Sequence, residues 1–363
     1  MGLGIRKSVL IKGILIFICL SVAVMVGILV WTTDSETWGH LRVFRLEFIP
    51  LILGLAVIRW FIDGMAFVTL AKHGSGIRIK KRRAAVIRLE GNLIADVIPF
   101  FVGIFSMHSY LLHKEKLSIG ESVTISASRA MIPIFLFLFN IPILFLMRSE
   151  PASGKLFVKL IEVVSIPVVV AVFFIVIAIF YPQSIKAFVS KSVRWWGRIK
   201  FVHVERILSL EKRLFFEIDQ FSRIFEMYLH EKKVMLLRAA AWIMLTFLAD
   251  ALFAVLILWG FGYPPSLGRA VAYQFLIWPI WYLTPLPGQA GVFEFSYLGF
   301  FSLFAPNSVI GLAVLVERLI FTYLPMAAGT FFLLREFNRD KRFKSMVMDD
   351  KIFVPENIKD MKL

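Results

Sequence analysis

The fold of this 363-residue chain is decided by the stretch Pro285-Leu286-Pro287-Gly288-Gln289-Ala290-Gly291, which interrupts an apolar region at residues 269–304. Proline lacks the backbone donor that a helix needs, and its ring clashes with the preceding turn, so a helix ends there. Each half of the region is then shorter than the ~20 residues that cross a bilayer. We therefore predict a re-entrant helical hairpin whose irregular turn is buried in protein.

A looser copy of this pattern lies in the first half of the chain. Region 84–112 is interrupted at Pro99, which is followed by Gly103. In each copy an ionisable residue follows the leading proline by nine positions, and these residues are His108 and Glu294. Helix breakers and ionisable groups are costly in lipid, so their repetition predicts a built site.

The composition indicates a membrane protein. The chain is 59% hydrophobic, with a mean hydropathy of +0.78. We predict an all-α polytopic fold with about six full transmembrane helices plus the two re-entrant hairpins. The full spans are expected at residues 8–31, 46–71, 121–147, 157–181, 236–260 and 308–334.

The distribution of basic residues predicts the topology. If both hairpins return to the side they entered, 32 of the 41 lysine and arginine residues share the side of the N-terminus. This satisfies the positive-inside rule with both termini in the cytoplasm, and it explains the net charge of +16 without nucleic-acid binding. The hairpins then enter from opposite faces, so their units form an inverted repeat, an architecture typical of transporters.

This topology divides the chain into five parts. They are a first transmembrane helix with an outer loop (1–45), a first repeat with a linking span (46–182), a cytoplasmic amphipathic helical insert (183–235), a second repeat (236–337) and a basic cytoplasmic tail (338–363). The insert either connects the repeats or is attracted to anionic headgroups.

Two arginines lie inside apolar segments that follow the hairpins. By helical rise, Arg129 is ~12 Å and Arg318 ~15 Å into its span. Each either pairs with a carboxylate to hold helices together or binds an anion, because guanidinium binds phosphate in a bidentate way.

The second hairpin offers further candidate binding residues. Glu294 either caps the second half-helix, pairs with Arg318, or contacts a cationic group or a proton. Gly288 and Gly291, with Gly103 in the first hairpin, would let a headgroup approach the backbone, and Gln289 lies between the first two.

Other buried polar residues have two interpretations each. Asn92, Asp96 and the nearby Glu90 either line a polar cavity or neutralise Arg129, and His108 either binds a headgroup or packs in the core. We expect Arg59 and Asp63, four apart on one helix face, to pair with each other. Asp250 and Glu317 are candidates for ion or proton coupling, and Asp250 is an equally good partner for an arginine.

No motif of catalysis or of cofactor binding is found in the sequence. There is no nucleophile elbow, P-loop or paired acidic metal motif. Cys19 is the single cysteine, so cysteine-rich metal sites are excluded. We expect no catalytic residues, no metal and no cofactor, and hence no enzyme.

The motifs together resemble the membrane region of lysylphosphatidylglycerol synthases and their stand-alone relatives, the flippase-like integral membrane proteins. The second half carries the resemblance in 285–294, in Glu317-Arg318, in Tyr323 and in Gly329. The first half carries it in Asn92, Pro99, Gly103, residues 110–114 and Arg129. Gln289 stands where the family pattern has a glycine.

The resemblance implies a lipid flippase or transporter of the cytoplasmic (inner) membrane of a prokaryote. It would move an anionic phospholipid or glycolipid between leaflets. Two alternatives remain: a non-transporting membrane partner of a lipid-modifying or envelope-building enzyme, and a lipid headgroup transferase. Membrane lipids are the expected partners, and the sequence leaves open a homo-oligomer.

Overall fold

A computed structural model describes most of the chain. It covers residues 7–34, 37–97, 101–137, 181–196, 230–284 and 286–339, with single residues between these ranges. The predicted span 157–181, most of the insert 183–235 and nearly all of the tail 338–363 lie outside the described residues.

The described residues form helices and contain no strand. The helices are α1 (Lys7–Thr32), α2 (Thr37–Val43), α3 (Phe48–Gly74), α4 (Lys81–Val97), α5 (Phe101–Lys114), α6 (Ile119–Leu136), α9 (Pro182–Trp196), α11 (Lys233–Gly260), α12 (Leu267–Leu283), η4 (Pro287–Gln289), α13 (Val292–Phe301), α14 (Asn307–Arg318), η5 (Leu319–Tyr323) and α15 (Leu324–Arg339).

Three of the described helices are long and apolar enough to cross a membrane. They are Phe48–Gly74, Lys233–Gly260 and the continuous helix Asn307–Arg335. They correspond to three of the six predicted spans. The chain is therefore an all-helical, multi-pass membrane protein, and the full count of six spans with two re-entrant hairpins stays a prediction.

Both predicted helix interruptions are present. α12 ends at Leu283, and α13 begins at Val292 beyond a turn that contains three residues with positive φ: Gly288 (54°), Gln289 (52°) and Gly291 (87°). In the first half, α4 ends at Val97 and α5 begins at Phe101, on either side of Pro99. Both interruptions therefore lie where the prolines of the sequence predicted them.

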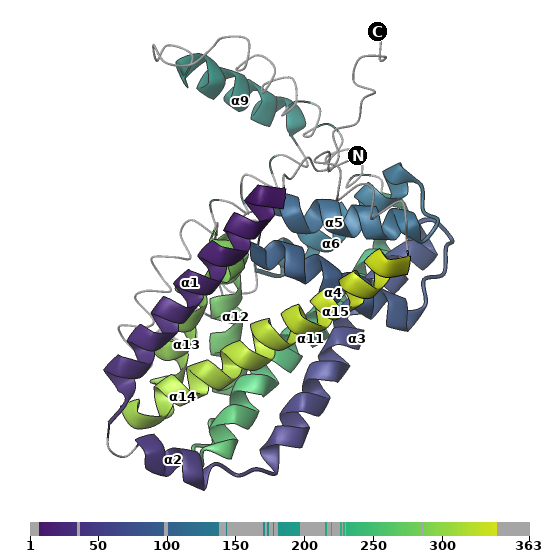
Figure 1. Ribbon diagram of the computed structural model, residues 1–363. Coiled ribbons are helices and arrows are strands. Elements are labelled where there is room, and N and C mark those ends of the chain that lie inside the picture. The colour runs from purple at the N-terminus through teal and green to yellow at the C-terminus, as the bar shows by residue number, and fades with distance from the viewer. Residues whose placement is uncertain are drawn as a thin grey trace.

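Helices from the two halves of the chain pack against each other. α3 and α11 make the most extensive contact, and α4 lies against both α3 and α15 (Figure 1). α1 runs beside α14, and the turn η4 contacts α1 and α4. One apolar cluster contains the second hairpin with α14, and another contains the first hairpin with α6. α3 contributes to both clusters, and they enclose the buried polar residues.

α4 approaches two neighbours at backbone distance. A Cβ atom added to Gly64 of α3 would lie 2.7 Å from the amide nitrogen of Ala85. One added to Gly329 of α15 would lie 2.5 Å from the carbonyl oxygen of Leu89. No side chain larger than hydrogen fits at either crossing, so both glycines fix the position of α4.

The last span contains a wide turn that the apolar pattern did not reveal. Residues Leu319–Tyr323 form a π-helical turn between α14 and α15, and the amide of Leu324 bonds to the carbonyl of Leu319, five residues earlier. Pro325 follows immediately, and a proline inside a helix displaces the carbonyl of the preceding turn. Such turns are frequent at functional sites, and this one begins directly after Arg318.

Candidate functional site

Arg318 occupies a closed polar pocket at the turn of the second hairpin. Its Nε lies 3.1 Å from Oε1 of Glu294, and its Nη2 donates a hydrogen bond to the carbonyl of Gly288 (2.9 Å). Glu294 also caps α13, because its Oε2 accepts a hydrogen bond from the amide of Gly291 (2.8 Å). Both side chains are fully buried. Capping and pairing with Arg318, predicted as alternatives, occur together.

α1 seals this pocket from the other side. Ser21 lies 3.4 Å from Nη2 of Arg318, 3.3 Å from Glu294 and 2.6 Å from the hydroxyl of Tyr323. The guanidinium also lies over the ring of Phe293, 4.6 Å from its centroid. The ring of Phe17 occupies the place of any side chain at Gly288, where an added Cβ would be 2.1 Å away. The absence of a side chain at Gly288 therefore makes room for the ring of Phe17, and this ring blocks the approach of a headgroup to the backbone there.

A second cluster surrounds Asp63 in α3. Arg88 of α4 donates to Oδ2 of Asp63 (2.5 Å), and Arg129 of α6 pairs with Oδ1. The Asp63 side chain is 1% exposed, whereas those of Arg88 and Arg129 are 15% and 10% exposed. Two guanidinium groups thus share one carboxylate, and the cluster carries an excess positive charge.

Two nitrogen atoms beside Asp63 remain without a hydrogen-bond partner among the described residues. They are Nε of Arg129 and Nε2 of His108, both buried. His108 packs edge-on against Phe67 and fills the space above Gly91, where a Cβ would lie 2.1 Å from Nε2. It also interacts electrostatically with Arg88 and Arg129. The cluster therefore has a free donor, Nε of Arg129, as well as surplus charge.

The expected pairing of Arg59 with Asp63 is wrong. Arg59 instead pairs with Asp250 of α11, through Nε to Oδ1 and through Nη2 to Oδ2 (3.3 Å). Its guanidinium also lies over the ring of Phe321, 4.6 Å from the centroid. Residues four apart share a helix face, but at Arg59 this face of α3 meets α11, and at Asp63 it meets α4. Asp250, predicted to couple ions or to pair with an arginine, holds α3 to α11.

Asp63 and Arg88 are the site residues that the sequence analysis missed. Asp63 pairs with Arg129, a role that was one of the two alternatives for Asp96 and Glu90, and Glu90 pairs with Arg83 (3.2 Å). Arg88 was not among the predicted site residues, and it lies two turns inside α4. Its position within region 84–112 was the available signal.

The remaining predicted residues lie in or near the first hairpin and α14. Asn92 is partly buried in α4, and Gly103 lies in α5. The side chain of Asp96 lies outside the described residues. Glu317 is fully buried in α14, and the hydroxyl of Tyr297 in α13 is its neighbour. Within that part, no group of three or more His, Cys, Asp or Glu residues could hold a metal ion.

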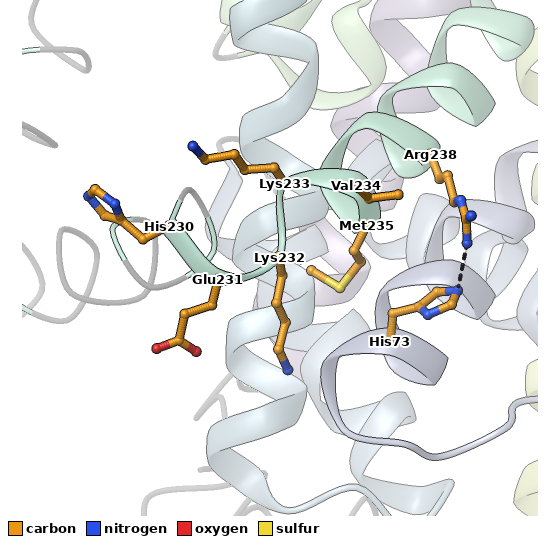
Figure 2. A pocket seen from close by; sticks show the side chains of 8 residues that line it. All are labelled: His73, His230, Glu231, Lys232, Lys233, Val234, Met235 and Arg238. Carbon is orange, nitrogen blue, oxygen red and sulfur yellow. Dashed lines mark hydrogen bonds between the residues drawn. The ribbon is translucent and has the colours of Figure 1, made fainter.

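A separate basic pocket opens where α3 ends and α11 begins (Figure 2). Its volume is about 370 Å³, and its lining includes His73, Lys232, Lys233 and Arg238. His73 and Arg238 point toward each other, with 3.5 Å between their nitrogen atoms, whereas Lys233 points away (Figure 2). Lys232 donates to the carbonyl of Gly74 (2.7 Å) at the C-terminus of α3. This pocket is shallow and surface-exposed, unlike the buried clusters.

Tyr228 lines an adjoining cavity of about 220 Å³ together with Glu121 of α6. Burial of the ring, with a smaller contribution from the Glu121 carboxylate, raises the pKa of Tyr228 to about 12. The phenol is therefore neutral at physiological pH.

Most of the chain matches a known protein family. Residues 18–329 match the family model described as the lysylphosphatidylglycerol synthase TM region. This range contains both hairpins and both buried arginine clusters. No curated protein matches the chain.

Proposed function

The chain belongs to the family of the lysylphosphatidylglycerol synthase TM region, and we propose that it moves an anionic phospholipid or glycolipid between the leaflets of the membrane. The family supports a function related to membrane lipids. The step from there to transport rests on the Asp63 cluster.

The observation that carries the proposal is that Arg88 and Arg129 share the single carboxylate of Asp63. A buried surplus charge costs several kcal/mol unless a counter-charge balances it. A phosphate group would supply that charge, and it would also accept from the free Nε of Arg129 and from His108. A lipid headgroup held there would leave its acyl chains in the bilayer.

The two hairpins then have different roles. Arg318 is surrounded by Glu294, Ser21, the Gly288 carbonyl and aromatic rings, which supports a role in holding the second turn in shape. Arg129 shares the carboxylate of Asp63 with Arg88, which supports a role in binding.

The basic pocket in Figure 2 supports the proposed orientation. Val234 and Leu237, next to its lysines, are 61% and 69% exposed, as expected where a helix enters lipid. Cations beside exposed apolar side chains are typical of a cytoplasmic membrane interface. We therefore place this end of α3 and α11 on the cytoplasmic side of the inner membrane.

Leaflet exchange in proteoliposomes tests the proposal. Vesicles of phosphatidylcholine would carry a trace of fluorescently labelled phosphatidylglycerol, and dithionite would quench the label in the outer leaflet. We expect the wild-type protein to expose the inner-leaflet label, and Arg129→Gln to slow this at least tenfold. Arg78→Gln is the matched control, because Arg78 is exposed at the start of the same hairpin unit.

The outcome also separates the alternatives. Equal rates for wild type and Arg129→Gln would contradict the role of the Asp63 cluster. No exchange by the wild-type protein, together with its co-purification with a lipid-modifying enzyme, would instead favour a non-transporting partner.

A further inference from the structure

The basic pocket of Figure 2 supplies no residue to the Asp63 cluster, yet it holds cations that no carboxylate neutralises. Arg238 of α11 lies 3.5 Å from Nε2 of His73, and within the described part of the chain no carboxylate pairs with it. Glu231, the one carboxylate among the lining residues, lies on the side of the pocket away from Arg238 and His73 (Figure 2). This edge of the pocket therefore carries uncompensated positive charge.

The surroundings of this edge suit a phosphate group. α3 ends at the pocket, and the negative end of its dipole would repel an anion, but Lys232 donates to the carbonyl of Gly74 (2.7 Å) and offsets that end. The pocket volume of about 370 Å³ lies within the range of ligand sites, roughly 300–1,000 Å³. The planar guanidinium of Arg238 matches the geometry of phosphate oxygens.

An exposed apolar stripe on α11 begins at the same place. Its members follow one another at intervals of three, seven or eight residues, close to whole helical turns, so they share one face. From Leu237 to Leu245 the stripe runs ~12 Å by helical rise, close to the ~15 Å depth of one leaflet. The members of the stripe are Val234, Leu237, Leu245, Leu252 and Trp259.

Cations and apolar side chains alternate at the start of α11. Val234 is one turn from Arg238, Lys233 is one turn from Leu237, and all four side chains are exposed. A water-soluble anion would contact only the cations, whereas a lipid would contact both kinds of side chain. The occupant that fits this surface is therefore an anionic phospholipid.

We propose that the pocket of Figure 2 binds one anionic phospholipid of the adjacent leaflet, with the lipid phosphate at Arg238 and His73 and an acyl chain along Leu237 and Leu245. The site lies at the surface and is separate from the Asp63 cluster. It does not depend on whether the protein moves lipid between leaflets.

Native mass spectrometry of the purified full-length protein in detergent tests the proposal. The probes are phosphatidylglycerol and phosphatidylcholine, and the measurement counts the lipid molecules that stay bound. We expect the wild type to retain phosphatidylglycerol in preference to phosphatidylcholine, and Arg238→Gln to weaken this retention at least tenfold. Leu237→Asn should weaken it as well. Excess inorganic phosphate should not displace the lipid, because it makes no apolar contact.

Arg335→Gln is the matched control. Arg335 is an exposed arginine beside the exposed side chains of Phe331 and Leu334, but it lines neither pocket described above, so this variant should retain phosphatidylglycerol as the wild type does. Arg238 is also exposed, so Arg238→Gln should unfold at the wild-type midpoint in detergent without lipid. Added phosphatidylglycerol should then raise the midpoint less in Arg238→Gln than in the wild type.

The same comparison in the Arg129→Gln background removes the contribution of the interior cluster. The loss caused by Arg238→Gln should have the same size there, because the effects of independent sites add. Wild-type retention by Arg238→Gln, an equal loss in Arg335→Gln, or displacement by inorganic phosphate would overturn the proposal.

Leaflet exchange separates this site from the proposed function. Arg238→Gln should slow the exchange of labelled phosphatidylglycerol less than twofold. Selective binding at Arg238 without any exchange by the wild type would support the surface site and contradict transport. Exchange at the wild-type rate with no selective binding at Arg238 would contradict the surface site alone.

Discussion

Arg129 and Arg318 follow the two hairpins at corresponding places, yet their surroundings differ. Arg318 has its own carboxylate, a backbone carbonyl and three aromatic rings, and α1 covers it. Arg129 shares the single carboxylate of Asp63 with Arg88. Among the described residues, Arg318 is therefore covered by α1 and paired with its own carboxylate, whereas the cluster around Arg129 has surplus positive charge. The comparison teaches that corresponding positions after the two hairpins need not have the same surroundings.

Of the substitutions that test this difference between the two arginines, Arg318→Ala should have the largest effect, and that effect is on stability. Arg318→Ala would leave Glu294 buried without its cation, and losing one partner of a buried pair costs about 3–5 kcal/mol. We expect a large drop in the thermal unfolding midpoint in detergent. The double variant Arg318→Met with Glu294→Gln should recover much of it, because both charges are then removed. If Arg318→Ala were as stable as the wild type, the Arg318–Glu294 pair would not be what holds the second turn in shape.

Arg88→Gln should have a smaller effect on stability, because Asp63 keeps Arg129 as a partner. We expect a loss of about 1 kcal/mol, as for one hydrogen bond to a charged group. The surplus charge disappears, however, and exchange of labelled phosphatidylglycerol should slow at least as much as in Arg129→Gln. Arg59→Gln, measured in the same unfolding experiment, is the contrast, since it leaves Asp250 unpaired. If Arg88→Gln destabilised the protein as much as Arg59→Gln, Arg129 alone would not be a sufficient partner for Asp63.

Gln289→Gly should stabilise the second turn slightly. A left-handed conformation costs a residue with a Cβ roughly 1–2 kcal/mol, and the greater freedom of glycine in the unfolded chain offsets part of the gain. We expect about 0.5–1 kcal/mol, measured as a higher unfolding midpoint. Lys116→Gly is the control, because Lys116 also has positive φ (72°) but lies outside both hairpin turns. A loss of stability at Gln289 alone would indicate that its side chain makes a needed contact.

The smallest effect is expected at the surface pocket of Figure 2. Lys233→Ala removes an exposed side chain that points away from the pocket, so the unfolding midpoint should not change. Exchange of phosphatidylglycerol should fall less than twofold. A drop as large as that of Arg129→Gln would move the binding site from the interior to this face.

The sequence predicted the features that depend on local chemistry. Helices are interrupted at Pro99 and at the Pro285–Gly291 stretch, as the missing proline donors predict, although Pro133 and Pro279 lie inside α6 and α12. The pairing of buried charges was not predictable in the same way. Arg59 finds Asp250, 191 positions along the chain, only because α3 packs on α11. Helical spacing places Arg59 and Asp63 on one face but does not say which neighbour each meets. The π turn had a local signal in Pro325, which the apolar pattern of its span concealed.

The crossings at Gly64 and Gly329 limit how the molecule can work. At both, backbone touches backbone, with no long side chain between them that could change rotamer to permit sliding. The helices α3, α4 and α15 therefore behave as one solid block, which carries Asp63 and Arg88 together. A transport cycle that admits a headgroup from alternate sides therefore needs movement at a different helix–helix contact. The contact of α6 with this block is a candidate, because α6 carries Arg129 and does not belong to the block.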